Sequence, residues 1–203
     1  MARVVGQIDL SKSEAILDAA VEVLAERGVT APMEDIARRA CVSKQTIYNH
    51  YGSKADLMRA VTARRVHEIV ASLEAPEAVE HPGEALAGFA RRMLMSITAP
   101  RSAAFMRMAM LGALEMPEVA AAIYEAGPRT TRRSLADFLA LETEAGRLAC
   151  PDPAEAAEFF AGMVLGSYQT AALLGVERNL DDEGKGRIAD EASARFMRAY
   201  APN

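Results

Sequence analysis

The sequence is poor in several residue types on which small proteins often rely. It has no tryptophan, aromatic residues make up only 5% of it, and it holds two cysteines and three histidines among 203 residues. Cys41 and Cys150 provide neither a disulfide framework nor a metal-binding spacing. His50, His67 and His81 lie beside no nucleophile pair, paired carboxylates or phosphate-binding loop. We therefore expect no metal site, no cofactor and no enzyme.

Long hydrophobic runs are also missing. Residues 1–10 contain one arginine and no apolar stretch of signal-peptide length. A membrane-spanning helix needs about 18 or more apolar residues in a row, and the most apolar segment, 161–175, is interrupted by Ser167, Tyr168, Gln169 and Thr170. We expect no secretory signal and no membrane partner, and a cytoplasmic location follows as the default.

Good helix formers are what the sequence does contain. Alanine, leucine, methionine, glutamate and arginine dominate, with 51% hydrophobic and 25% charged residues overall. Apolar residues recur at helical spacing and prolines separate the segments. The prediction is an all-α fold of about nine or ten helices, over residues 13–27, 33–40, 44–51, 54–73, 84–98, 102–115, 117–126, 128–145, 153–174 and 182–201.

The charge of the chain is unevenly distributed. The net charge is −5, yet residues 1–65 hold ten Lys/Arg against eight Asp/Glu, a local excess of +2. The remainder holds thirteen against twenty, which is −7. A basic end on an acidic molecule concentrates the attraction for DNA at that end.

The segment 33–51 has the pattern of a helix-turn-helix, in which two short helices are joined by a tight turn. Ser43 is a good N-cap for the second helix, and Ile47 and Tyr51 share its buried side. A polar outer face on such a helix suits the major groove of DNA. The candidate DNA-binding residues, which can bond base edges or phosphates, are Ser43, Lys44, Gln45, Thr46, Tyr48, Asn49, His50 and Lys54.

Residues 11–61 as a whole resemble the N-terminal domain of the TetR family of transcriptional regulators. The matching pieces are Ile16-Leu17-Asp18-Ala19-Ala20, Gly28, Glu34-Asp35-Ile36-Ala37, Val42-Ser43, Thr46-Ile47-Tyr48-Asn49-His50-Tyr51 and Ser53-Lys54-Ala55-Asp56-Leu57. The range 11–61 makes up about a quarter of the chain. The rest agrees with the family in length and helical character.

The resemblance implies a homodimer that places one recognition helix of each subunit in a major groove of double-stranded operator DNA. Tyr48, His50 and Lys54 fall at positions that hold phosphates, and Gln45, Thr46 and Asn49 fall where bases are read. It also implies a DNA-binding domain over 11–61 and a helical effector-binding and dimerisation domain over 62–203.

Three positions depart from the family pattern. Cys41 replaces the usual glycine of the turn, where a positive φ would strain a side chain. Pro32 replaces the usual Ser or Thr cap of the second helix, with Thr30 as a possible substitute for its phosphate contact. Gln45 replaces a frequent glycine and adds a side chain able to read adenine.

A cluster of methionines and aromatic residues indicates an apolar effector pocket in the second domain. Thioether side chains adapt to irregular shapes, although helical spacing explains the same residues equally as ordinary core. The candidate lining consists of Phe89, Met93, Phe105, Met106, Met110, Tyr124 and Tyr168.

Small residues spaced four apart, Gly162 and Gly166, lie on the predicted helix 153–174 and permit close helix approach. With the resemblance, this helix and 182–201 form the dimer interface, although an intramolecular helix pair would use the same pattern. The candidate interface residues are Phe159, Phe160, Met163, Ser167, Thr170 and Phe196.

The function that these observations favour is a transcriptional repressor, released from its operator by a small, largely apolar effector. One alternative is an effector-independent architectural DNA-binding protein, against which the acidic second domain argues. The other is a helical enzyme, for which the sequence offers no catalytic motif.

Overall fold

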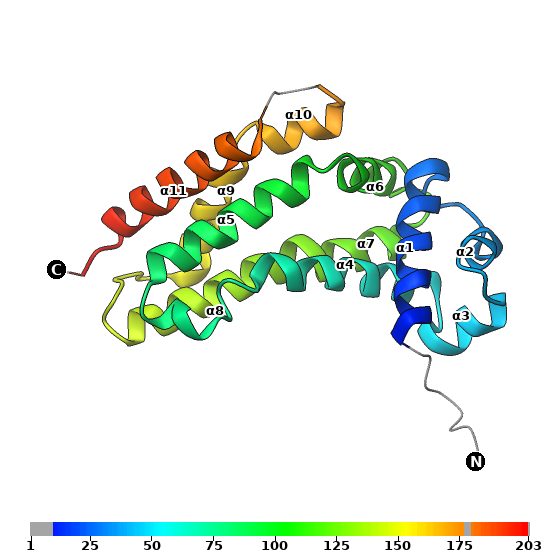
Figure 1. Ribbon diagram of the computed structural model, residues 1–203, viewed down its shortest axis with the longest axis horizontal. Helices are drawn as coiled ribbons and strands as arrows, with labels where there is room; N and C mark the ends of the chain where they lie inside the picture. The colour runs from blue at the N-terminus through cyan, green and yellow to red at the C-terminus, as the bar shows by residue number, and fades with distance from the viewer. Residues whose placement is uncertain (1–9, 177–179, 203) are drawn as a thin grey trace, which may run out of the picture. The chain divides into compact units, whose positions relative to one another are not determined.

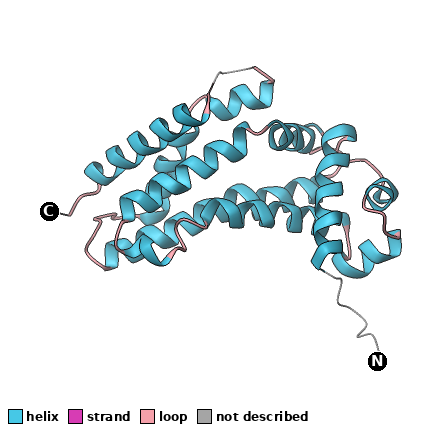
Figure 2. Cartoon of the chain, viewed as in Figure 1, coloured by secondary structure: helices cyan, strands magenta, loops and turns pink. Residues whose placement is uncertain are grey.

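The structure is a computed structural model that describes residues 10–176 and 180–202. In those ranges the chain is helical and has no strand, as Figure 2 shows, so the predicted all-α class is confirmed. The α-helices, labelled in Figure 1, are α1 (Leu10–Arg27), α2 (Met33–Arg39), α3 (Lys44–Tyr51), α4 (Lys54–Val70), α5 (Pro82–Thr98), α6 (Pro100–Leu111), α7 (Pro117–Tyr124), α8 (Thr130–Glu144), α9 (Pro153–Leu165), α10 (Tyr168–Leu174) and α11 (Asp182–Ala199). The short 3-10 helix η1 (Pro76–Val79) precedes α5, and the π-helix η2 (Glu125–Arg129) joins α7 to α8.

The chain packs as two compact units. The first, called the head unit here, contains the described residues up to Arg64 together with Ala104–Gly127. The second, called the body unit, contains Arg65–Ala103 and the described residues from Pro128 onward. The division expected from the sequence, at residue 61, treats the chain as two consecutive segments. The packing instead adds the end of α6 and all of α7 to the unit that holds the helix-turn-helix.

The head unit has its own hydrophobic core. Ile16 of α1, Ile36 of α2, Ile47 of α3 and Leu57 of α4 are fully buried in it. The later segment contributes Phe105, which is buried in the same cluster. Burying one such side chain stabilises a fold by about 1.5–3 kcal/mol. The burial of Ile36 and Ile47 in this core therefore stabilises the short helices α2 and α3.

A close backbone approach connects the two segments of the head unit. α1 ends at Arg27, and the next residue, Gly28, has a φ of 83° and makes the turn toward Val29. A Cβ built on Gly112, just after α6, would lie 2.1 Å from Cγ2 of Val29. Position 112 therefore admits only glycine while Val29 keeps its place.

Replacing Gly112 by alanine is expected to lower the free energy of unfolding by about 1–3 kcal/mol, the usual cost of overpacking. The added methyl group must displace the Val29 side chain. Urea denaturation measures the effect, and the Val29→Ala/Gly112→Ala double variant should recover part of the loss because the opposing methyl groups are gone. Wild-type stability of Gly112→Ala would contradict the close approach.

The body unit is built around aromatic side chains. Phe89 of α5, Phe160 of α9 and Phe196 of α11 are buried together. The ring centroids of Phe89 and Phe160 lie 6.2 Å apart, and those of Phe160 and Phe196 lie 5.1 Å apart at an interplanar angle of 81°. Edge-to-face contacts of this kind add to the hydrophobic gain. They fix α9 and α11 against α5.

An ion pair with a buried carboxylate closes the connection between α8 and α9. Oε2 and Oε1 of Glu142 accept hydrogen bonds from Nε and Nη2 of Arg147 at 2.6 and 2.9 Å. Glu142 is buried, and its contact raises the pKa of the Arg147 guanidinium. A carboxylate tolerates burial here because the guanidinium neutralises it in a two-pronged geometry.

Two sequence expectations about helix ends were wrong. The predicted helix 153–174 is split into α9 and α10, because Gly166 adopts a φ of 43° and leaves the helical region. With this split, the described residues form eleven α-helices, in agreement with the prediction of about nine or ten. The first helix begins at Leu10 and not at the predicted residue 13, so Ser13 lies inside α1, and its hydroxyl bonds the hydroxyl of Tyr51 at 3.0 Å.

Candidate nucleic-acid interface

The turn between α2 and α3 has the geometry that a helix-turn-helix requires. Ser43 is the N-cap of α3, and its Oγ accepts a hydrogen bond from the backbone N–H of Thr46 at 3.0 Å. The N–H of Val42 donates to the carbonyl of Ala37 at 3.0 Å, which ties the turn to α2. Val42 packs against the head core, as expected of the wedge residue between the helices. The predicted cap is confirmed.

Cys41 has a φ of 55°, the strained conformation that the sequence analysis expected at this turn. A side chain in the left-handed region costs about 1–2 kcal/mol. Cys41→Gly is therefore expected to raise the free energy of unfolding by about 1 kcal/mol, after allowance for the greater flexibility of unfolded glycine. Thermal unfolding under reducing conditions measures it. Cys41→Ala is the control, since it removes the thiol and keeps the strain, and equal stability of the two variants would refute the strain argument.

The outer face of α3 is presented to solvent, and its inner face is packed. Ser43, Lys44, Gln45, Tyr48, Asn49 and His50 are exposed, and Thr46 is half-buried. Ile47 is fully buried. The ring of Tyr51 is half-buried on the core side, where burial raises the pKa of its hydroxyl. The division of α3 into a solvent-exposed face and a packed face is thus as predicted.

Gln45 and Asn49 form a pair one helical turn apart on the exposed face. Nε2 of Gln45 donates to Oδ1 of Asn49 at 2.6 Å. This bond leaves the carbonyl oxygen of Gln45 and the amide nitrogen of Asn49 available to a ligand. One acceptor beside one donor is the complement of the adenine edge in the major groove.

Lys44 lies at the start of α3, where helix N–H groups also attract anions. Its ammonium donates to the carboxylate of Glu34 on α2 and lies 5.6 Å from the ring centroid of Tyr48. The hydrogen bond that Lys44 donates to Glu34 raises the pKa of Lys44. Lys44 and Tyr48 therefore form one cationic and aromatic surface beside the amide pair.

Lys54 is more constrained than the sequence suggested. Its ammonium donates to the backbone carbonyl of Ala31, in the loop before α2. Partial burial lowers the pKa of Lys54, opposed by the carboxylate of Glu118 on α7. The lysine thus joins the start of α4 to the α1–α2 loop, so a phosphate contact would compete with this bond.

The N-terminus of α2 lacks a side-chain cap. Pro32 occupies the N-cap position with a φ of −62°, and no side-chain hydrogen bond replaces the missing Ser or Thr. Thr30 is exposed. These observations agree with the expected departure from the family pattern at Pro32.

Arginines that the sequence analysis did not single out fix α2 against α1. Arg39 donates to Glu22 at 2.9 Å and to Glu26 at 2.8 Å. Arg27 donates to Asp35 at 2.6 Å. Glu22 and Glu26 lie four residues apart on α1, and that spacing opposite a C-terminal arginine of α2 was the available signal. These pairs orient the helix-turn-helix without taking part in its outer face.

The candidate effector residues are divided between the two units. Phe89 and Met93 are buried in the body core, and Tyr168 packs against that core. Phe105 is buried in the head core, and Met106 packs against it. Met110 and Tyr124 are exposed by 57% and 58%. The seven residues therefore do not form one cluster in either core.

The candidate interface residues divide by exposure. Phe159 and Met163 of α9 are exposed by 57% and 43%, and Ser167 and Thr170 are also exposed. Phe160 and Phe196 are fully enclosed in the body core. We therefore assign Phe160 and Phe196 to the core, because a partner cannot reach a side chain that its own chain encloses.

Two further features of the described residues bear on other classes of function. No helix in the ranges 10–176 and 180–202 is both long and apolar enough to cross a bilayer. Over the same residues, no three His, Cys, Asp or Glu side chains come together in a way that could hold a metal ion.

Comparison with known families now places the chain. Residues 16–61 match the family of bacterial regulatory proteins named for TetR, and residues 84–202 match the C-terminal domain of AefR-like transcriptional repressors. The second match alone covers more than half of the chain. The protein belongs to the TetR family of helix-turn-helix transcriptional regulators, which confirms the resemblance found in residues 11–61.

Individual relatives agree with this assignment. The HTH-type repressor LfrR of Mycolicibacterium smegmatis is 42% identical over 72 residues, 35% of this chain and 37% of that protein. The regulator TtgW of Pseudomonas putida is 33% identical over 91 residues, 44% of this chain and 66% of that protein. The chain thus matches less than two thirds of the length of these curated relatives.

Solved structures match over nearly the whole chain. The flavonoid-responsive regulator FrrA superposes with a TM-score of 0.72 and 30% identity, over 96% of this chain and all of that one. A TetR-family regulator from Mesorhizobium loti superposes with a TM-score of 0.74 and 25% identity, over 94% and 96% of the two chains.

Proposed function

We propose that the protein is a transcriptional repressor that binds operator DNA as a homodimer and leaves it when a small, largely apolar effector binds. The observation that carries the proposal is the exposed face of α3, where Gln45 and Asn49 offer base-reading amides beside Lys44 and Tyr48. Phosphate contacts come from Lys44, Tyr48, His50 and Lys54. The site of action is the cytoplasm, where the DNA is.

The proposed effector is an aromatic, mostly apolar molecule. FrrA, which is 30% identical, is responsive to flavonoids by its name, and flavonoids have planar aromatic rings. In the body unit, Phe89, Met93 and Tyr168 gather side chains of the kind that pack against such rings. We propose that the effector is sensed where the partly buried Tyr168 packs against the core that encloses Phe89 and Met93.

The proposed dimer uses α9 and α11 of the body unit. Phe159 and Met163 are large apolar side chains left exposed on α9, and a Cβ on Gly162, beside Met163, would meet nothing within 4 Å. An exposed apolar stripe of this kind is typical of a surface that a partner covers. Two heads on one dimer can then engage half-sites about 34 Å apart.

Fluorescence anisotropy with a labelled duplex tests the proposal. The duplex is first selected from a random-sequence pool by binding to the full chain. The protein should bind it saturably, and naringenin, a flavonoid, should release it while glucose should not. Binding that no apolar compound in a wider panel releases would favour the architectural alternative. Failure to select any duplex would overturn the proposal that the protein acts by binding operator DNA.

The enzyme alternative receives no support from the described residues. Neither His50 nor His67 lies in a cluster that could hold a metal, and His50 contacts the Tyr51 ring edge to face at 4.5 Å. We therefore propose regulation without catalysis. Turnover of a substrate by the purified protein would reverse this choice.

A further inference from the structure

The exposed side of α11 carries a regular ladder of charges. Glu183, Arg187, Glu191 and Arg195 follow one another at intervals of four residues, so they lie along one face of the helix and alternate in sign. All four side chains are exposed. Nε of Arg195 donates to Oε1 of Glu191 at 2.6 Å. Glu183 and Arg187 have no ion-pair partner among the described residues.

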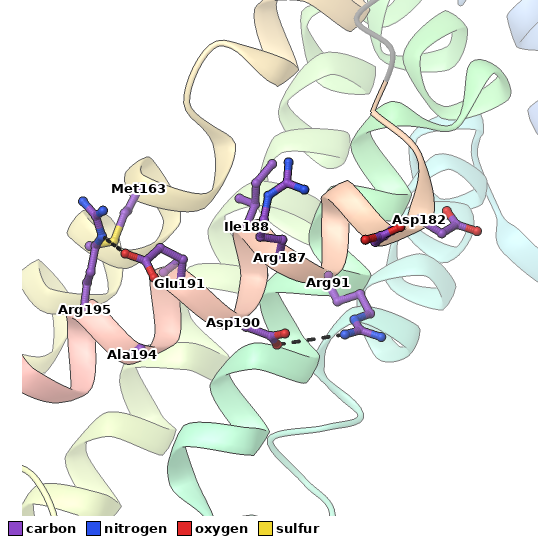
Figure 3. Close-up of a pocket in the computed structure, with 12 residues that line it drawn as sticks. Arg91, Met163, Asp182, Arg187, Ile188, Asp190, Glu191, Ala194 and Arg195 are labelled. Carbon is purple, nitrogen blue, oxygen red and sulfur yellow. Dashed lines mark hydrogen bonds and ion pairs between the residues drawn. The ribbon is translucent and has the colours of Figure 1, made fainter.

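This ladder borders an open groove of the body unit. The groove has a volume of about 1000 Å³, and residues of α11 line it together with Met163 of α9 and Arg91 of α5. Figure 3 shows Glu191 and Arg195 on the side of α11 nearest Met163, with Asp190 directed toward Arg91 instead. Charges of α11 therefore lie beside Met163, an exposed apolar side chain of α9.

We propose that the ladder docks against the same ladder of a second copy of this chain, with the two α11 helices antiparallel and held in one register. The proposal rests on the homodimer of the proposed function. A two-fold axis perpendicular to a helix places its copy antiparallel to it. If the axis crosses α11 at the level of Ala189, Arg187 faces Glu191 of the second copy and Glu183 faces Arg195 of the second copy.

The charges select this register over its neighbour. With the axis two residues farther along, at the level of Glu191, each Glu191 would face the other and Arg187 would face Arg195. The facing pairs at 191 and at 187 and 195 would then join like charges, and Glu183 would face the uncharged Ala199. The two arrangements differ by only about 3 Å in the position of the axis, at 1.5 Å per residue. Apolar contacts alone would favour the two arrangements about equally, whereas the charges attract with the axis at Ala189 and repel with the axis at Glu191.

α9 and α11 contribute differently to the proposed interface. Phe159 and Met163 on α9 supply apolar area that a partner can cover. Charges at the edge of an interface contribute mainly to specificity and register. The charge ladder would thus reject chains that lack the same pattern, which keeps a regulator from pairing with its relatives.

The same spacing also stabilises a single helix, because Glu and Arg four residues apart attract each other along it. The experiment must therefore separate contacts within α11 from contacts between two copies. Mixing two charge-reversed variants achieves this, since contacts within a helix are unchanged by mixing.

The variants are Arg187→Glu and Glu191→Arg in the full chain. In either homodimer, positions 187 and 191 of the two copies carry like charges. In a mixed dimer the same positions carry opposite charges at both symmetry-related contacts. Sedimentation velocity at low salt should show each variant dissociating about tenfold or more readily than wild type, with an equal mixture returning to within a few-fold of it. High salt should reduce the differences.

A second pair, Glu183→Arg and Arg195→Glu, repeats the test at the other contact. It replaces the first pair if circular dichroism shows that either of those variants is misfolded. A mixture that dissociates as readily as its components would overturn the register while leaving the dimer intact. A wild-type chain that is monomeric at every concentration would overturn the dimer of the proposed function as well. The two failures are therefore distinguishable.

Discussion

Replacing Gln45 by alanine is expected to weaken operator binding by about 2–6 kcal/mol in the homodimer. A good side-chain contact to a base edge contributes about 1–3 kcal/mol of discrimination, and a symmetric dimer loses it at both half-sites. The bond from Gln45 to Asn49 at 2.6 Å is also lost, so the remaining amide is no longer held in place. The effect should be confined to one base pair of each half-site.

The measurement is anisotropy on the selected duplex and on duplexes changed at each position in turn. Lys44→Ala is the matched control, because Lys44 is the neighbouring exposed residue and carries a charge instead of an amide. It should weaken binding by a similar factor on all duplexes and flatten the dependence on salt. If Gln45→Ala weakens all duplexes equally, Gln45 does not read a base.

Replacing Phe160 by alanine is expected to lower the free energy of unfolding by about 3–5 kcal/mol. Phe160 is fully buried and contacts Phe89 and Phe196 at centroid distances of 6.2 and 5.1 Å. The truncation leaves a cavity where α5, α9 and α11 meet, and neighbouring rings cannot fill it without leaving their rotamers. Urea denaturation followed by circular dichroism measures the change.

Phe159→Ala is the matched control, since it removes the same side chain from the adjacent position. Phe159 is 57% exposed, so its loss should change the stability of the monomer by roughly 0.5 kcal/mol or less. It should instead promote dissociation of the proposed dimer. Equal losses of stability in the two variants would contradict the assignment of Phe160 to the core and Phe159 to the surface.

The head could be predicted closely because its signals are local. Ser43 caps the helix that follows it, and Ile47 faces inward because the helical period leaves it no other side. The strain at Cys41 followed from a turn type that requires a positive φ. Each of these features depends on residues within a few positions of one another, so the linear sequence contains nearly all the relevant information.

The body could not be predicted to the same depth because its decisive contacts are distant in sequence. Phe159 and Phe160 are both large and apolar, and periodicity alone did not indicate which of them α5 and α11 enclose. Gly166 looked like a small residue on a helix face, whereas its φ of 43° ends α9. A glycine permits either role, and only the surrounding packing selects one.

The sequence by itself determined the helical class, the helix-turn-helix and the residues that α3 exposes to solvent, because capping, turn strain and helical period act over a few residues. The tertiary structure decided that Ala104–Gly127 packs with the head, that Lys54 is held by the carbonyl of Ala31, and which apolar side chains of α9 remain exposed. Those outcomes depend on which surfaces meet after the helices have formed. Close packing settles them. At Gly112, for example, an added Cβ would lie 2.1 Å from Cγ2 of Val29.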